Sequence, residues 1–295
     1  MSILNPIACR WPFASLFGLA LFLGAASLAG GPAMTPPKGK VRIILLHHST
    51  GEIIWENGLP SFFKDWNQAH GTRYEVTEQY YPNTTRGHTW LLRLLRAKLF
   101  DRLVNHYPWD NYPYDYWNLW VAHTGKDRDR AELNLDDLAR SYDVIVFKHC
   151  YPVSNVKPDN GHPSVSSPEK TLANYELQYE ALKVRMHQFP EKRFIVWTPT
   201  ALHQATTNAE DAGRANQFST WVKQTWDEKG DNIFVWDWRQ LETAGEGLYI
   251  KPELAEKPDS DYPSPAFAAQ AAALLGHRIV DVIEGRGDES SLTGQ

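Results

Sequence analysis

A serine follows the first apolar segment of the sequence at a position suited to nucleophilic chemistry. The run Val41–Leu46, apolar apart from Arg42, predicts a buried strand, and the pentapeptide His47–Gly51 (HHSTG) comes directly after it. A serine at a sharp strand-to-helix turn, followed closely by glycine, can expose its Oγ as a nucleophile. Its own backbone N–H can then help to bind an oxyanion. The alternative interpretation is that Ser49 caps the next helix.

Polar residues that could assist such a serine follow the other predicted strands. Gly87 comes after the second strand and permits close backbone approach to a ligand, and Asn155 comes after the third and could donate to an oxyanion. His203 follows the fourth strand, where an imidazole could act as an acid or a base. Asp259 precedes the last predicted helix and could orient a base or bind a cation. The ordinary interpretations are a turn glycine, a turn-forming asparagine, a solvated histidine and a solvated acid.

These residues would share one rim because the chain alternates predicted strands and helices. The strand candidates are Val41–Leu46, Arg73–Tyr80, Asp143–Lys148, Arg193–Thr198 and Asn232–Asp237. The second is the most polar and suits an edge strand. Ser167, Asn208 and Ser264 are predicted to start the helices after the last three strands. The pattern predicts a single-domain α/β fold, a flavodoxin-like three-layer sandwich with a five-stranded parallel sheet. Ligands bind beyond the carboxyl ends of the strands in such sheets.

Segments outside this domain have their own composition. The apolar stretch Trp11–Leu28 ends in small residues, and residues 1–33 are therefore predicted to be a secretory signal peptide. An uncleaved membrane anchor is the alternative. Residues 34–40 form a Pro-containing linker, 41–283 the α/β domain, and 284–295 a Gly/Ser/Asp-rich tail that is predicted to be disordered. We expect a secreted or periplasmic protein that meets a membrane only if the leader remains attached.

An aromatic insert at about residues 107–142 separates the second and third predicted strands. Its first part, Tyr107–Val121, contains seven tyrosine and tryptophan residues. Flat rings with polar tips can stack on sugars or line an acyl pocket, and the alternative is a small core under a long loop. Trp117 in this insert, together with His48 and Arg86, is a candidate substrate-binding residue.

Composition excludes several other classes of function. The chain has 295 residues, with Lys+Arg 30 against Asp+Glu 35 and a net charge of -5. It therefore lacks the basic character that a nucleic-acid partner would require. Of its two cysteines, Cys9 lies in the predicted leader, so Cys150 would stand alone in the mature protein. No internal disulfide and no cysteine-based zinc site are expected.

The order and placement of these pieces resemble the SGNH/GDSL hydrolase superfamily over roughly residues 41–283. Ser49 occupies the place of the family's nucleophilic serine, with His47-His48-Ser49 instead of the usual Gly-Asp-Ser. Gly87 matches the glycine of the second block. The third block, normally Gly-x-Asn-Asp, is absent as such, and Asn155 is a nearby candidate for its asparagine.

The last block of the family, Asp-x-x-His, is half present. Asp259 matches the aspartate, whereas the histidine position holds Tyr262. An imidazole can accept the serine proton near physiological pH, but a tyrosine with a pKa of about 10 is a poor base there. Another imidazole would have to replace it, and His203 is the first candidate, ahead of His149 and His48.

The resemblance implies an exported serine esterase or acetylesterase that acts on small-molecule or glycan esters. Ser49 would attack the ester carbonyl, Asp259 would orient the base, and no metal or organic cofactor is implied. The N–H groups of Ser49 and Gly87, with Asn155, would hold the oxyanion. The alternative is a non-catalytic glycan-binding protein on the same fold, in which Tyr262 takes part in ligand binding.

Overall fold

The computed structural model of the protein describes residues 39–82, 110–128, 132–245 and 247–295. All described residues belong to one compact unit. The predicted signal peptide, and the candidate site residues Arg86 and Gly87, lie outside the described residues.

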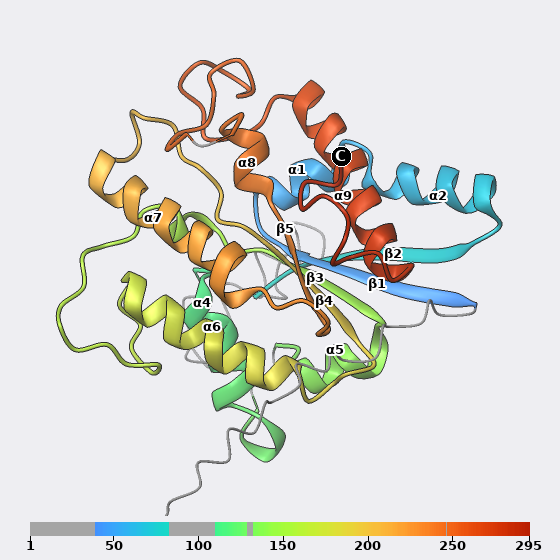
Figure 1. Ribbon diagram of the computed structural model, residues 1–295, viewed down its shortest axis with the longest axis horizontal. Helices are drawn as coiled ribbons and strands as arrows, with labels where there is room; N and C mark the ends of the chain where they lie inside the picture. The colour runs from blue at the N-terminus through green and yellow to red at the C-terminus, as the bar shows by residue number, and fades with distance from the viewer. Residues whose placement is uncertain (1–38, 83–109, 129–131, 246) are drawn as a thin grey trace, which may run out of the picture. The chain divides into compact units, whose positions relative to one another are not determined.

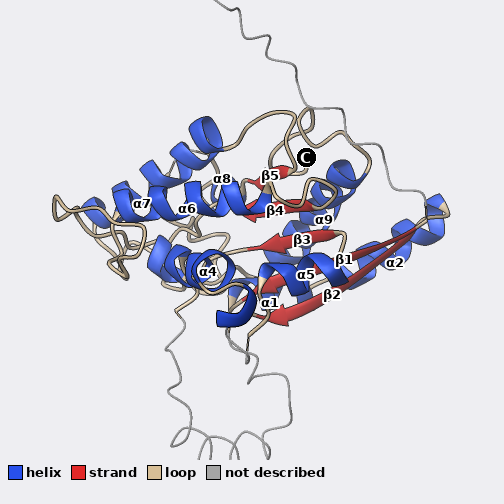
Figure 2. Cartoon of the chain, turned by 90° about the horizontal axis from the view of Figure 1, so that it is seen from below, coloured by secondary structure: helices blue, strands red, loops and turns tan. Residues whose placement is uncertain are grey.

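Five parallel strands form one sheet in the described part of the chain. They are β1 (Lys40–His47), β2 (Arg73–Tyr80), β3 (Val144–Phe147), β4 (Arg193–Trp197) and β5 (Ile233–Trp236). Their order across the sheet is β2-β1-β3-β4-β5, which Figure 2 shows as five successive arrows. This is the order of the flavodoxin-like fold. The predicted α/β fold with a five-stranded parallel sheet is confirmed, and so is the edge position of Arg73–Tyr80.

Helices cover both faces of this sheet (Figure 1). One face carries α1 (Thr50–Glu56), α2 (Leu59–His70) and α9 (Pro265–Ile283). The other face carries α4 (Pro113–Trp117), α5 (Leu135–Ser141), α6 (Leu172–Met186) and α7 (Ala209–Trp221). The short helix α8 (Trp238–Glu242) follows β5, and single helical turns occur at η2 (Asn118–Ala122), η3 (Gly125–Asp127), η4 (Tyr151–Val153) and η5 (Val222–Trp226). The three layers of the predicted sandwich are therefore present.

Alternate residues of the central strands fill two different cores. In β1, Ile43 and Leu45 pack with α1, α2 and α9, whereas Ile44 and Leu46 pack with α4 to α7. Burial on both faces explains why these strands read as continuous apolar runs. Among the described residues, α9 alone is long and apolar enough to cross a membrane, and its apolar side packs in the first of these cores.

Two of the three predicted helix starts are correct. The side chains of Asn208 and Ser264 accept hydrogen bonds from the third residues of α7 and α9. The prediction for Ser167 is wrong, because α6 starts at Leu172. The Ser167 hydroxyl accepts the N–H of Glu169 in a local turn at 3.2 Å instead, and the chain stays non-helical up to Thr171.

Much of the aromatic insert belongs to a main core of the domain. Tyr116 and Trp120 are fully buried and pack on Phe147 of β3, at ring centroid distances of 5.3 and 5.2 Å. The indole N–H of Trp120 donates to the Tyr81 hydroxyl at 2.6 Å. Trp117 lies on α4 and is half-buried beside Tyr114, which leaves part of its ring exposed.

The last residues of the chain are packed against the domain, although the sequence predicts disorder for them. The backbone N–H of Asp237 donates to the carbonyl of Leu292 at 2.8 Å, and the indole of Trp236 donates to the carbonyl of Thr293 at 3.0 Å. The guanidinium of Arg278 in α9 binds the carbonyl of Gly287 at 2.6 Å. Gly/Ser composition does not reveal such partners, because they come from the end of β5, the residue after it and α9.

Candidate functional site

The turn after β1 and the loop after β3 meet at the carboxyl edge of the sheet. Ser49 Oγ lies 3.7 Å from Cys150 Sγ, within hydrogen-bonding distance for sulfur. Because β2 lies on one side of β1 and β3 on the other, this is the point where the strand order reverses. Flavodoxin-like sheets bind their ligands at that point.

Ser49 adopts a strained backbone conformation. Its φ of 41° and ψ of -103° lie in a region that non-glycine residues rarely occupy. Such a conformation costs on the order of 1–3 kcal/mol and is concentrated at active sites. Ser49 is the N-cap residue of α1 by position, yet its side chain makes no capping hydrogen bond. The hydroxyl is therefore not used for the helix and faces the thiol of Cys150.

Gly51 allows the turn to be this tight. A Cβ at Gly51 would lie 2.3 Å from Cβ of His47, which is too close for real atoms, and 3.1 Å from Cδ of Lys148, which is a tight contact. Only glycine lets the start of α1 cross the end of β1 at this distance. The Ser-x-Gly spacing seen in the sequence thus corresponds to a steric requirement of the turn.

A buried lysine lies under the same turn. Lys148 follows β3, is 1% exposed, and its Nζ donates to the carbonyl of His48 at 3.2 Å. Burial lowers the pKa of Lys148, while the neighbouring Cys150 and Glu242 act in the opposite sense. Glu242, on α8, is fully buried, and burial raises its pKa well above the usual value.

An asparagine with positive φ supports the loop after β3 from behind. Asn111 has a φ of 57° and is fully buried. Its carbonyl accepts the N–H of Cys150 at 2.7 Å, and its side-chain amide donates to the carbonyl of Tyr81 at 2.6 Å. Asp115 accepts the N–H of Asn111 at 2.7 Å, and burial raises the pKa of this carboxyl to about 7.

The two histidines before Ser49 are both engaged in other contacts. His47 Nε2 pairs with Glu78 on β2 at 2.7 Å. The His48 ring stacks on Tyr80 at 3.7 Å, and its Nε2 lies 2.8 Å from the carbonyl of Pro82. Both rings are buried, so His48 has little surface to offer a substrate.

His149 is enclosed in the core. It is 3% exposed and packs edge-on against Tyr116 at 4.6 Å. Burial, reinforced by the charge of Lys148, lowers the pKa of His149 well below its usual value. The imidazole is therefore neutral near pH 7 and is shielded from any substrate.

His203 lies on the loop after β4 and is half-buried. Its Nδ1 accepts the backbone N–H of Ala205 at 3.1 Å, which places the proton of a neutral imidazole on Nε2. Nε2 of His203 is then a donor, and it cannot accept a serine proton while this contact holds. The backbone N–H of His203 donates to the carboxylate of Asp261 at 2.6 Å.

Asp261 connects the loop before α9 to the loop after β4. Its Oδ1 also accepts the hydroxyl of Thr206 at 2.7 Å. Asp259 is exposed, and its carboxylate makes no hydrogen bond to any residue that the structure describes. The ring of Tyr262 lies 5.9 Å from that of Tyr151, the residue after Cys150. The loop before α9 therefore reaches the loop that contacts Ser49.

Asn155 lies on the same rim. Its side-chain oxygen accepts the hydroxyl of Thr207 at 3.0 Å, which joins the loop after β3 to the start of α7. The amide nitrogen of Asn155 has no hydrogen-bond partner among the described residues. It could donate to a ligand, as the sequence predicts.

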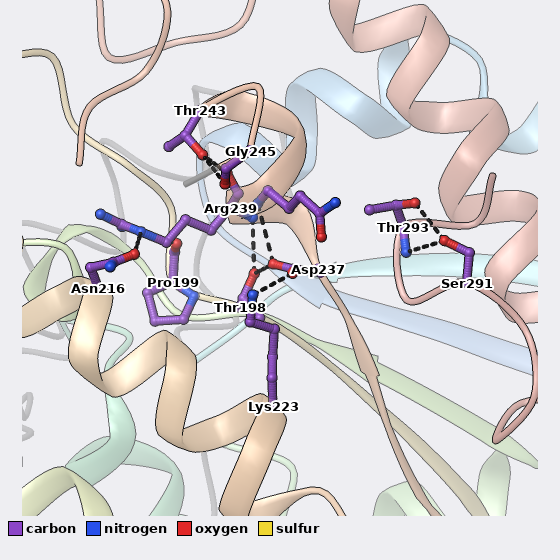
Figure 3. Close-up of polar contacts among 11 residues, drawn as sticks. Thr198, Pro199, Asn216, Lys223, Asp237, Arg239, Thr243, Gly245, Ser291 and Thr293 are labelled. Carbon is purple, nitrogen blue, oxygen red and sulfur yellow. Dashed lines mark hydrogen bonds and ion pairs between the residues drawn. The ribbon is translucent and has the colours of Figure 1, made fainter. Parts of the chain in front are cut away.

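A buried polar network fixes the start of the loop after β4 (Figure 3). Asp237, at the end of β5, accepts the Thr198 hydroxyl at 2.9 Å and the ammonium of Lys223 at 2.6 Å. The backbone N–H of Arg239 donates to Thr198 Oγ1 at 2.9 Å. Burial lowers the pKa of Arg239 to about 10, so its guanidinium stays charged at neutral pH.

The candidate site residues do not line the cavity of about 470 Å³ that lies on another part of the domain. That cavity is bounded by Thr124, Gly125, Arg128, Asn134, Asp136, Arg140 and Arg185. Its three arginines all bind aspartates. Within the described residues, no group of three or more His, Cys, Asp or Glu side chains is placed to hold a metal ion.

Sequence reasoning missed four residues of this region. Lys148, Cys150, Tyr151 and Asp261 all contact the Ser49 turn or the loops beside it. Lys148 carried a signal, because a lysine at the end of an otherwise apolar strand needs a buried partner. The sequence gives no sign that Asp261, and not Asp259, makes the hydrogen bonds to the loop after β4, because side chains in an irregular loop follow no periodicity.

No protein-family model matches the chain, and no curated protein matches it. Among solved structures, the chain has a distant similarity to a carbohydrate esterase whose active site displays divergent catalytic and non-catalytic binding functions. The TM-score is 0.34 and the sequence identity 13%, and the match covers 83% of this chain and 66% of that chain.

Proposed function

We propose that this protein is an exported SGNH-like serine esterase that removes acyl groups, such as acetyl, from small-molecule or glycan esters. The observation that carries the proposal is the strained turn of Ser49. Its φ of 41° and the absence of a capping bond leave the hydroxyl at the switch point of the sheet, where its contact is the Cys150 thiol. Strain of this kind at a strand-to-helix turn is the hallmark of a nucleophile turn.

The proposed reaction proceeds through an acyl-enzyme. Ser49 Oγ gives its proton to hydroxide and forms a bond to the ester carbonyl carbon, and the C–O bond to the alcohol breaks as water supplies a proton to the alcohol oxygen, which regenerates hydroxide. Water then attacks the acyl-serine, which releases the acid and restores the hydroxyl. The backbone N–H of Ser49 donates to no group among the described residues, so it can bind the oxyanion. Asn155 is a second proposed donor, and Gly87 a third.

Proton transfer sets the expected rate. Within the described residues, the one hydrogen-bonding contact of Ser49 Oγ is Cys150, and no imidazole touches it. His203 would have to give up the N–H of Ala205 before its Nε2 could act as a base. We therefore expect slow hydrolysis whose rate rises with pH, because hydroxide replaces the missing imidazole as the proton acceptor.

A fluorophosphonate probe and short acyl esters test this proposal. Wild-type protein should be labelled on Ser49 and should hydrolyse 4-nitrophenyl acetate and acetylated xylo-oligosaccharides. Ser49→Ala should lower hydrolysis by at least ~100-fold, as loss of a serine nucleophile does in other enzymes, and should abolish labelling. Ser219→Ala, which removes a buried hydroxyl from α7, is the matched control and should keep both activities. Equal hydrolysis by Ser49→Ala would overturn the serine mechanism.

A non-catalytic glycan-binding role is the second candidate. It is favoured by the lack of an imidazole at Ser49 among the described residues, and by the aromatic pair Tyr151 and Tyr262 beside the site. This role predicts carbohydrate binding without turnover, weakened by Tyr262→Ala or Trp117→Ala. Calorimetry with non-acetylated oligosaccharides, together with absence of probe labelling, would favour it over the esterase.

A further inference from the structure

The peptide unit between His48 and Ser49 is anchored from one side only. Its carbonyl accepts two hydrogen bonds, from Lys148 Nζ at 3.2 Å and from the backbone N–H of Gly51 at 3.0 Å. The N–H of the same peptide, which belongs to Ser49, donates to no group in the described part of the chain. This asymmetry is unusual for a nearly buried backbone segment.

Because the peptide unit is planar, the hydrogen bonds of the His48 carbonyl also determine the direction of the Ser49 N–H. In a trans peptide, the C=O and N–H bonds point in opposite directions. The His48 carbonyl points to the ammonium of Lys148, which is 1% exposed and therefore inside the domain. The N–H of Ser49 must then point away from that buried group, towards the side on which an oxyanion would form.

We propose that Lys148 is a positioning residue that holds the His48–Ser49 peptide in this orientation and so preforms the oxyanion site. The inference rests on the proposed esterase function and extends it to a residue that does not touch substrate. A half-turn of the peptide would bring the φ of Ser49 from 41° back to negative values and relieve the backbone strain. The same movement would point the N–H inward and bring a carbonyl oxygen, which repels an oxyanion, into its place. The ammonium opposes this movement, because it would lose its hydrogen bond.

Packing alone does not account for a lysine at this position. A buried ammonium carries a desolvation penalty that an apolar side chain of the same length would not. Glu242 is the acidic group whose charge acts on Lys148, and burial itself favours the neutral form of that carboxyl. Replacing Lys148 should therefore leave the fold intact while releasing the peptide.

Two substitutions separate positioning from structure. Lys148→Met keeps the length of the side chain and removes the donor, whereas Lys148→Gln keeps a neutral N–H donor. Lys183→Met is the matched control, because Lys183 is also buried but lies on α6 and binds Glu228 at 2.8 Å, away from Ser49. The measurements are kcat and KM for 4-nitrophenyl acetate, the rate of fluorophosphonate labelling, and the thermal midpoint.

We expect Lys148→Met to lower kcat and the labelling rate by about 10- to 100-fold, at the lower end of the effect of removing an oxyanion donor. KM should stay within about threefold, because an oxyanion contact acts in the transition state. The thermal midpoint should not fall. Lys148→Gln should give an intermediate kcat, and Lys183→Met should keep the wild-type kcat.

Wild-type kcat in Lys148→Met would overturn the inference while leaving the esterase in place. So would a change in KM alone, or a loss of kcat that merely follows a loss of folded protein. If wild-type protein shows no Ser49-dependent hydrolysis or labelling, the esterase proposal fails and this inference fails with it.

Discussion

The two sides of the candidate site are built differently. On the side that we propose to carry the nucleophile, the turn at Ser49 has a strained backbone, Gly51 makes room for it, and the buried Lys148 binds it. On the opposite side, before α9, the loop is held by hydrogen bonds near the surface, and Tyr262 stands where the proposed SGNH resemblance would place a histidine. A strained, tightly packed turn can be kept only by specific residues, whereas a surface loop tolerates change. The nucleophile side is therefore where we expect function to be most sensitive.

Gly51→Ala is the variant that tests most directly whether the Ser49 turn is the more sensitive of the two sides. The new Cβ would lie 2.3 Å from Cβ of His47, so the start of α1 must move. Overpacking of this kind costs about 1–3 kcal/mol of stability. Movement of the turn should also lower esterase activity by at least ~100-fold, because small displacements at a reacting centre have large kinetic effects. Urea unfolding and fluorophosphonate labelling measure the two effects.

Gly213→Ala is the control for this substitution. Gly213 lies in α7, and a Cβ there would meet no atom within 4 Å. Alanine in a helix interior should raise stability by up to about 1 kcal/mol and leave activity unchanged. If Gly51→Ala behaves like Gly213→Ala, the nucleophile turn is not under the constraint described above.

Tyr262→His tests the loop before α9, and we expect a smaller effect from it than from Gly51→Ala. An imidazole has a pKa of about 6.5, so it can accept the serine proton at neutral pH. We expect hydrolysis of acyl esters to rise by roughly 10-fold, the low end for a base that has not been optimised in place. The pH–rate profile should gain an inflection near 6.5, and Tyr262→Phe should show neither change. A rate that is unaltered by histidine would mean that this loop does not reach the serine.

The smallest expected effect is on the pH dependence of the unfolding free energy, through Asp115, which supports the loop after β3. Burial raises the pKa of Asp115 to about 7, above an unfolded value near 3.9. Between these values the folded protein holds a proton that the unfolded chain has lost, so the free energy of unfolding falls as pH rises. The contribution is complete below pH ~4 and is lost as pH passes through about 7.

Asp115→Asn should flatten this dependence. Subtracting the variant's unfolding free energies from those of the wild type, in urea titrations from pH 4.5 to 7.5, cancels the other titrating groups. The difference should fall with pH, with a slope of up to ~1.4 kcal/mol per pH unit. A difference that is flat, or that rises with pH, would contradict the raised pKa.

The sheet was predictable from the sequence because burial on both faces leaves a direct trace. Val41–Leu46 is apolar apart from Arg42, the core of Asp143–Lys148 is the apolar run Val144–Phe147, and both segments are interior strands of the sheet. The position of Ser49 followed from the end of the first run. Its φ of 41° did not, because a serine carries no local signal for a strained conformation. That conformation is imposed by Gly51 and the residues packed beneath the turn.

The hydrogen-bond partners of individual side chains, both local and between distant segments, were the part that could not be predicted. The expectation for Ser167 failed because a serine followed by proline starts a turn as readily as a helix. His203 was a sound candidate by type, yet the contact from Ala205 that decides its tautomer is visible only in three dimensions. Asp261 and Asp259 differ in their partners and not in any pattern of the sequence.

The packed C-terminal residues limit how far this protein can be shortened. Arg278 in α9 is 1% exposed, and its guanidinium is satisfied by Val235, Gly287 and Ser290. Trimming the chain at residue 284, where its composition turns to glycine and serine, would remove two of these three partners. The guanidinium would keep only the carbonyl of Val235, and a buried charge that loses hydrogen bonds is destabilising. Proteolytic cleavage or truncation at this boundary would therefore loosen the C-terminal end of α9. Because the first turn of α9 follows Tyr262, the loosened helix would also disturb the candidate site.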